Sequence, residues 1–279
     1  MYKLHDFMGV LEQVAPLSYS HKMIERGDYD NSGIIVQNTN EVNKVLFSLD
    51  LSLDAVKKAI ELNCDTIVTH HPAIYMPIKS LGVDESSKPL LLAIKNGVNV
   101  ISMHLNLDIA SCGIDQSLAV GLGAKDVKVL DLVDGECGYG RLSTLQKQPL
   151  QHFVDQIKQT FNSQKIICYG QNEVQKVASF CGSGGSVALS VLGNKEIDTI
   201  VTSDLAHHEL KEMIEQGKNV VIIPHYVSEQ FGFNIFYQTI AKMANQKIES
   251  FYSEEKLNFT LRVNQIFLGI HGKSIFWIL

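Results

Sequence analysis

The sequence lacks the cysteine pattern of a thiolate metal site. Its five cysteines are odd in number, and no two of them form a CxxC pair. This usage suits a reducing compartment and does not describe a disulfide framework. The chain has ten histidines, so imidazole and carboxylate groups are the expected ligands of any metal ion.

Long apolar runs and a basic excess are also missing. No apolar run reaches the ~18 residues that a membrane-spanning helix needs. The N-terminus has neither the basic start nor the apolar stretch of a signal peptide, and no arginine precedes Arg26, unlike in a transit peptide. The formal net charge of -6 leaves no global basic footprint for nucleic acid. We therefore expect a cytoplasmic protein that binds neither membranes nor nucleic acid directly, with the nucleus and the mitochondrion as alternatives left open.

The most informative stretch runs from Asp65 to Ala73 and reads DTIVTHHPA. Its β-branched residues predict a buried strand, which Pro72 ends. His70 and His71 then lie at the carboxyl end of a strand, where open α/β sheets bind their ligands. A turn at Pro72 would aim both imidazoles into one crevice. By itself, however, a pair of adjacent histidines is more often incidental than a metal site.

An internal repeat gives this stretch its context. Asp198 to Thr202 reads DTIVT again, and each half of the chain reads as strand, helix, strand, helix, strand. A later strand ends at His104 in the first half and at His225 in the second. We predict an α/β fold made of two similar, duplicated α/β domains, with the histidine-bearing strand ends facing each other across a cleft. The predicted domains are residues 1–126 and 127–254.

The pattern of apolar residues predicts the individual elements. A polar loop is expected from residue 18 to 33, and a domain boundary near 125–134. A longer loop at 74–87 has no counterpart in the second half, and it either shapes a site or is a tolerated insertion. Residues 255–279 form an apolar tail that could pack as a strand, bind a partner or stay loosely ordered. Helices are predicted at 3–14, 52–62, 89–96, 114–122, 150–162, 205–216 and up to about 244, and strands at 34–36, 44–49, 65–71, 98–103, 139–147, 165–169, 175–181, 198–202, 219–223 and 247–252.

Two histidines are each followed, four residues later, by an acidic residue, directly after a predicted buried strand. This spacing places both side chains on one side of a turn. Together with His70 and His71, these two pairs supply four imidazoles and two carboxylates. Such a ligand set suits Zn, Fe, Mn or Co. These groups are too many for one tetrahedral zinc that keeps a water, and about right for two divalent metal ions ~3.5–4 Å apart that activate water. The six predicted metal ligands are His70, His71, His104, Asp108, His225 and Glu229.

Two further segments could take part in chemistry. Asp204 and His208 follow the second DTIVT, at the place of the histidine pair in the first. Asp204 is either a helix N-cap, with His207 and His208 in the first turn, or part of a proton-transfer pair beside the metals. The glycine-rich segment 182–186 is not a P-loop, because no Lys-Ser/Thr follows. It reads as a tight strand-to-helix turn, and less readily as an anion-binding turn.

Several short motifs complete the pattern within residues 3–254. They are YDNSG at 29–33, THHP at 69–72, HLNLD at 104–108, GYGR at 138–141, GSGG at 182–185, SD and HHE within 203–209, and HYVSE at 225–229. Together these motifs resemble the NIF-three-like proteins, also called GTP cyclohydrolase I type 2 homologues. Two departures are Ser203, where the family often has glycine, and the tail beyond Glu254.

This resemblance implies a dinuclear metal site between two similar domains, with the same six ligands. It also implies a toroidal homohexamer whose sites face an internal cavity. Two functions stay open. The first is a metal-dependent hydrolase of a small molecule, nucleotide or pterin-like, with Asp204 or His208 moving protons. The second is a non-catalytic hexameric metal-binding scaffold, or a partner of transcriptional regulators.

Overall fold

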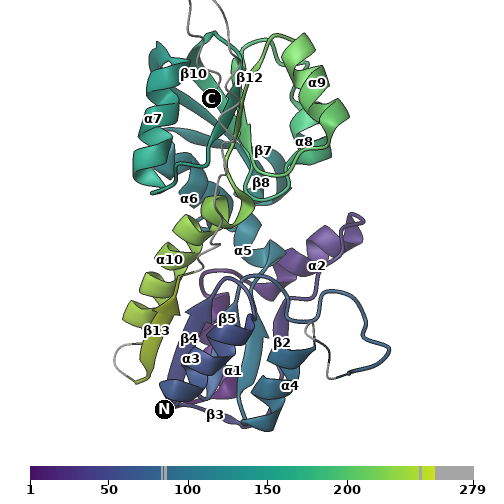
Figure 1. The fold of residues 1–279 in the computed structure, drawn as a ribbon, viewed down its shortest axis with the longest axis vertical. Helices are drawn as coiled ribbons and strands as arrows, with labels where there is room; N and C mark the ends of the chain where they lie inside the picture. The colour runs from purple at the N-terminus through teal and green to yellow at the C-terminus, as the bar shows by residue number, and fades with distance from the viewer. Residues whose placement is uncertain (83, 85–86, 245–246, 255–279) are drawn as a thin grey trace, which may run out of the picture.

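The chain forms two lobes stacked along its long axis, each built around one β-sheet (Figure 1). The computed structural model describes residues 1–82, 84, 87–244 and 247–254. The predicted tail, residues 255–279, lies outside the described residues. Three helices lie at the junction of the lobes: α5 (Leu105–Ile109), α6 (Ile114–Gly121) and α10 (His225–Met243). The predicted α/β class is confirmed.

The first lobe holds a five-stranded sheet in the order β13-β4-β5-β6-β2. Its strands β4, β5 and β6 are parallel, as expected for strands joined by helical crossovers. Apolar residues of α3 and α4 cover one face, and those of α1 and α10 cover the other. The bounds are β13 Glu249–Ser253, β4 Lys44–Ser48, β5 Thr66–Thr69, β6 Asn99–Ser102, β2 Gly33–Val36, α1 Leu4–Glu12, α3 Leu53–Glu61 and α4 Lys88–Lys95, with the small pair β1 Tyr2–Lys3 and β3 Glu41–Val42 beside them.

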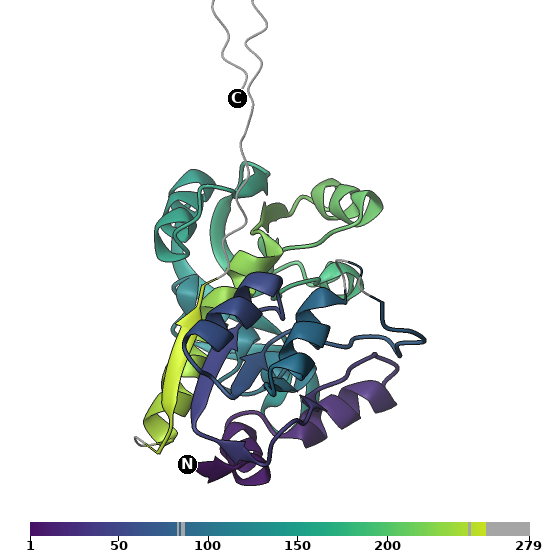
Figure 2. The ribbon, with the colours of Figure 1, turned by 60° about the horizontal axis from the view of Figure 1, so that its bottom comes forward.

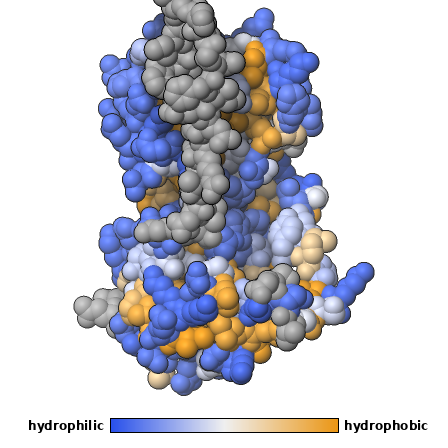
Figure 3. Space-filling model, viewed as in Figure 1, coloured by the Kyte–Doolittle hydropathy of each residue, from blue (hydrophilic) through white to orange (hydrophobic). Residues whose placement is uncertain are grey.

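The second lobe holds a six-stranded sheet in the order β7-β8-β10-β11-β12-β9. Its three parallel strands β10, β11 and β12 match β4, β5 and β6 of the first lobe. Helices α8 and α9 pack on one face and α7 on the other; in Figure 3 the outer faces of α7 and α9 are hydrophilic. The bounds are β7 Val127–Asp134, β8 Cys137–Pro149, β9 Ile167–Tyr169, β10 Glu173–Ser179, β11 Thr199–Thr202, β12 Asn219–Ile222, α7 Leu150–Thr160, α8 Gly185–Ser190 and α9 His207–Glu215.

The same hydrogen bonds recur where the core strands begin in both lobes. Asp65 accepts the N–H of Lys44 at 3.4 Å, and Asp198 accepts that of Lys176 at 2.7 Å. A buried asparagine on the next strand donates to the threonine after each aspartate. These pairs are Asn99 with Thr66 at 3.3 Å and Asn219 with Thr199 at 3.1 Å. The repeated sequence DTIVT therefore makes the same local structure twice.

One local prediction is wrong. The predicted polar loop contains nearly all of α2 (Leu17–Glu25), which begins after Pro16 and buries Ser20 and Met23. Its inward face has few apolar residues, so the helical period is weak in the sequence. The segment 125–134, where a domain boundary is predicted, contains the strand β7, an edge of the second sheet. The side chains of β7 alternate in burial only in part, so the strand pattern is weak in the sequence.

The end of the described chain returns to the first lobe. Strand β13 pairs in parallel with β4, and Figure 2 shows the two side by side. The predicted second domain, residues 127–254, included this strand, so its assignment there is corrected. The cause is α10, whose 19 residues carry the chain back along the molecule. The division near residue 126 otherwise stays a prediction. Within the described ranges, no helix is long and apolar enough to cross a membrane.

Candidate metal centre

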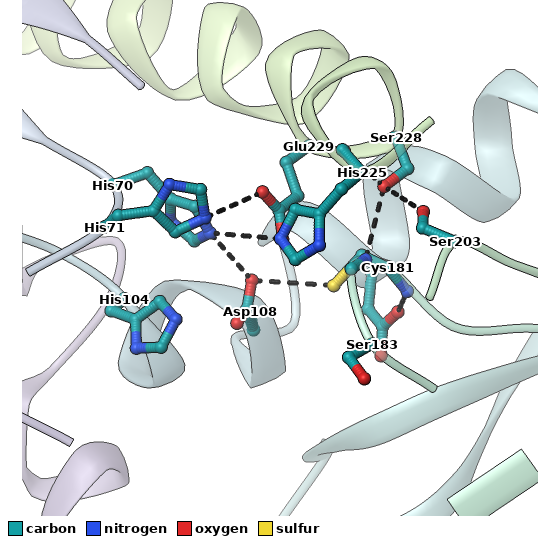
Figure 4. A network of polar contacts seen from close by, with 12 residues as sticks. His70, His71, His104, Asp108, Cys181, Ser183, Ser203, His225, Ser228 and Glu229 are labelled. Carbon is teal, nitrogen blue, oxygen red and sulfur yellow. Dashed lines mark hydrogen bonds and ion pairs between the residues drawn. The ribbon is translucent and has the colours of Figure 1, made fainter. Parts of the chain in front are cut away.

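A cavity of about 590 Å³ lies between the lobes and is lined by residues of both. Its floor is built where three buried strands end. Strand β5 is followed by His70 and His71, β6 by His104 and α5, and β12 by His225 and α10. Strands made of β-branched and small apolar residues thus deliver polar side chains to one place. The structure brings together all six predicted ligands, and Figure 4 shows them facing one another.

Glu229 is the carboxylate on which three imidazoles converge. It is 3% exposed and extends from the second turn of α10. Its Oε1 lies 2.9 Å from His225 Nε2 and 3.8 Å from His70 Nε2, and its Oε2 lies 3.0 Å from His71 Nε2. A carboxylate in this position can bridge two ions.

His70 carries the clearest sign of a missing partner. The residue is 0% exposed, and its Nε2 has no hydrogen bond. The nearest carboxylate oxygen, Asp108 Oδ1, lies 3.4 Å away. Buried polar atoms are rarely left unsatisfied in native proteins. A divalent ion at this nitrogen would satisfy it, so the residues present fit a metal ion.

The other ring nitrogen of each histidine is held by an acceptor. Hydrogen bonds from Nδ1–H fix the tautomer and turn Nε2 toward the centre, as in many metal sites. Three of the acceptors are carboxylates and one is a main-chain carbonyl. The four pairs are His70 with Met103 O at 2.8 Å, His71 with Asp50 at 2.7 Å, His104 with Asp30 at 2.7 Å and His225 with Asp204 at 2.6 Å.

Two overlapping groups of ligand atoms are close enough to hold ions. In each, one atom per residue lies within 4.8 Å of the others. The first group is His70, His71 and His104, and the second is His71, His225 and Glu229. Asp108 adjoins the first group through His70. The arrangement offers a place for a metal ion, with donors to spare for a second one.

The charges of the cluster depend on one another. Burial opposes protonation of His71, but hydrogen bonds to Asp50 and Glu229 outweigh it and raise the pKa to about 10. Burial likewise opposes protonation of His225, yet Glu229 and Asp204 raise its pKa to about 9. Although burial favours the neutral acid, these imidazoles hold the pKa of Glu229 well below its usual value. Without a metal, the protonated imidazoles balance the charge of Glu229, and a bound cation would replace their protons.

A family model called Duf34/NIF3 (NGG1p interacting factor 3) matches residues 2–258. The chain belongs to the Duf34/NIF3 family. The resemblance drawn from the motifs is therefore confirmed.

Relatives and solved structures agree with the Duf34/NIF3 assignment. The GTP cyclohydrolase 1 type 2 homolog of Clostridium acetobutylicum is 29% identical over 235 residues, 81% of this chain and 85% of that protein. NGG1-interacting factor 3 of Saccharomyces cerevisiae is 27% identical over 243 residues, 77% and 83% of the two chains. A Bacillus cereus protein related to NIF3 shares the fold, with a TM-score of 0.83 at 18% identity over 94% and 99% of the chains. Reduced HcgD from Methanocaldococcus jannaschii has a TM-score of 0.76 at 27% identity over 90% and 97%.

In this Duf34/NIF3 chain, Asp204 and His208 lie in different surroundings. Asp204 is not the N-cap of α9, which is Ala206, so that interpretation is wrong. It instead accepts the Nδ1–H of His225 from beside the site. His208 lies exposed in the first turn of α9, and it belongs to neither ligand group nor to the cavity lining.

Three residues that contact the predicted ligands were not predicted from the sequence. Asp30 and Asp50 hold His104 and His71, and the Cys181 thiol donates to Asp108 at 3.5 Å. Asp30 lies inside the family motif YDNSG, which could have marked it. Asp50 follows β4 at the same sheet edge as the histidine pair, and that position was the available signal. For Cys181 the sequence holds no signal of this contact.

The glycine-rich segment serves close packing against the site. Gly182 has a φ of +54°, and a Cβ atom there would lie 2.5 Å from Glu229 Oε1. The N–H groups of Gly182 and Gly184 donate to Ser228 and Thr202. Since these donors are used inside the fold, the tight-turn interpretation is confirmed for them.

Asp30→Asn is expected to weaken metal binding by about 10- to 100-fold. Asp30 holds His104 and also accepts hydrogen bonds from Ser20 and Ser32. An amide accepts at one atom only, so His104 would lose its fixed tautomer. Competition with a chelating dye measures the affinity. Asp54→Asn on the exposed side of α3 is the control, and equal affinity in both variants would contradict this role.

Proposed function

We propose that this chain binds two divalent metal ions between its lobes and uses them to hydrolyse a small molecule. The carrying observation is that the Nε2 atoms of His70, His71 and His225 converge on two buried carboxylates beside His104. In all four histidines Nδ1 is already held. The predicted ligands are His70, His71, His104, Asp108, His225 and Glu229, and the predicted ions are Zn, Fe, Mn or Co.

When bound, two such ions supply a water of lowered pKa and polarise a substrate oxygen. The chain's own residues line the cavity and move protons. Glu229 and Asp108 belong to the cavity lining and are buried there. Asp204 has a side chain 62% exposed and a hydrogen bond to His225, so it can pass a proton between the site and solvent. His208, predicted for the same role, belongs to neither ligand group nor to the cavity lining, whereas Asp204 contacts His225, so the geometry favours Asp204.

The substrate class follows from the relatives and from size. A relative is named GTP cyclohydrolase 1 type 2 homolog, which suggests a nucleotide or a pterin-like compound. The cavity volume of about 590 Å³ falls in the range of small-molecule sites. Fold alone does not decide the substrate, so this part of the proposal rests on the relative's name and on the size of the cavity.

An assay of metal-loaded protein tests the hydrolase proposal. Protein loaded with Mn, Zn or Fe is incubated with nucleosides, nucleotides, pterins and phosphoesters. We expect turnover that a chelator abolishes and added metal restores. Because Asp204 also holds His225, Asp204→Asn is assayed at a metal concentration that keeps its site loaded, and under that condition kcat should fall by about 10²- to 10⁴-fold. A metal-replete protein that hydrolyses nothing in this set would rule the proposal out.

The second candidate is a metal-binding scaffold, proposed to form a homohexamer and to bind a partner related to transcription. The name of the yeast relative, NGG1-interacting factor 3, favours it. Sedimentation should then give six times the chain mass of 31.0 kDa. Deletion of residues 255–279 should abolish capture of the partner with unchanged metal content, and unchanged capture would argue against a tail-mediated version.

A further inference from the structure

The side of the cavity near His104 carries an aromatic side chain held in place. Tyr75 lines the cavity and is 47% exposed, with its ring centre 6.2 Å from that of His104 at an interplanar angle of 89°. Its hydroxyl donates to the Tyr29 carbonyl at 3.2 Å, and the two tyrosine rings lie 5.1 Å apart. The side-chain amide of Asn31 donates to the carbonyl of Ile74 at 2.6 Å.

Tyr75 lies in the predicted loop at residues 74–87, which has no counterpart in the second half of the sequence. Of the two interpretations of residues 74–87, the place of Tyr75 in the lining supports the one in which the loop shapes a site. The ring of Tyr75 is held by its neighbours and is partly open to the cavity. Such a ring offers a stacking surface that is already in position before a ligand binds, which lowers the entropy cost of binding.

The charges around the same cavity are unfavourable for a chain of phosphates. Apart from histidines, Arg26 is the one basic residue among the described residues that line it. Its guanidinium already binds both carboxylate oxygens of Asp131, at 2.7 and 2.8 Å. Asp28 and Asp131 themselves add negative charge to the lining. A triphosphate extending away from the metal ions would meet carboxylates and no free cation.

We propose that the ligand of this cavity is a planar heteroaromatic compound without an oligophosphate chain, which stacks on Tyr75 while its polar edge faces the metal centre. Guanosine and neopterin represent this class, and GTP does not. The inference rests on the proposed function for the metal site, and it narrows the substrate from nucleotides in general to nucleobase- or pterin-type rings.

Calorimetric titration of Mn-loaded protein with guanosine, neopterin and GTP tests the inference. We expect guanosine or neopterin to bind, and GTP to bind no more tightly than guanosine. Tyr75→Ala should raise the Kd of the ring compound by about 5- to 100-fold. Tyr75→Phe, which keeps the ring, should stay within about threefold of the wild type. Tyr169→Ala removes a tyrosine of similar exposure on β9 and should change nothing.

A charge variant gives a second readout. Asp28→Asn should tighten GTP binding severalfold and leave guanosine binding unchanged. The inference is overturned if neither ring compound binds, if GTP binds more than tenfold tighter than guanosine, or if Tyr75→Ala behaves like Tyr169→Ala. Metal content is measured on the same samples. A protein without metal contradicts the proposed function. If the protein is loaded with metal but Tyr75→Ala leaves the Kd of the ring compound unchanged, this inference alone is contradicted.

Discussion

Glu229→Ala is expected to leave the purified protein without either metal ion. Its two oxygens lie 2.9 Å from His225 and 3.0 Å from His71, and it also adjoins His70. Removal of this carboxylate takes away one anion and, within the part of the chain that the structure describes, the only side chain that contacts three of the imidazoles. Since groups that only orient ligands are worth 10- to 100-fold in affinity, we expect a loss of at least about 100-fold. Elemental analysis after dialysis measures it.

Two further variants separate loss of a ligand from loss of the fold. Glu229→Gln keeps the size of the side chain but offers a weaker, neutral ligand, so it should also lose metal while the circular dichroism spectrum stays native. Glu212→Ala, on the exposed side of α9, should keep its metal. Wild-type metal content in Glu229→Ala would show that Glu229 is not a ligand.

Metal binding near pH 7.5 is expected to release about two protons. In the metal-free protein, the pKa of His71 is raised to about 10 and that of His225 to about 9, because carboxylates outweigh the effect of burial. Both imidazoles are therefore protonated at this pH and must lose a proton to bind a cation. Calorimetry in buffers of different ionisation enthalpy gives the number released.

The same pKa values fix how the stability of the metal-free protein depends on pH. Histidines whose folded pKa is raised stabilise the fold fully below their unfolded value of 6.5, and this contribution is lost as pH rises through 9 and 10. We expect the Tm without metal to fall between pH 7 and 10, and metal to raise Tm most at the upper end. His71→Ala should reduce the fall in Tm of the metal-free protein between pH 7 and 10. A metal-independent Tm profile with no proton release would contradict this assignment.

The candidate ligands could be predicted because they obey local patterns. His70 and His71 follow a β-branched run directly, and the spacing of four in His104 to Asp108 and His225 to Glu229 places each pair on one side of a turn. The repeat of DTIVT then indicated that the two halves share a design, which the recurring hydrogen bonds of Asp65 and Asp198 bear out.

What the sequence could not predict depends on contacts between distant segments. Asp30 reaches His104 across 74 residues, and Asp50 reaches His71 across 21. No local period encodes either pairing. The return of β13 to the first sheet is of the same kind, since a strand's partner is decided by packing of the whole fold and not by its own residues.

Anomalous diffraction from crystals of the metal-loaded protein tests the two-metal centre most directly. We predict two peaks ~3.5–4 Å apart, one bound by His70 and His104 and the other by His71 and His225, with Glu229 or Asp108 between them. A single peak at full metal loading, or peaks that lie away from these side chains, would contradict the dinuclear site.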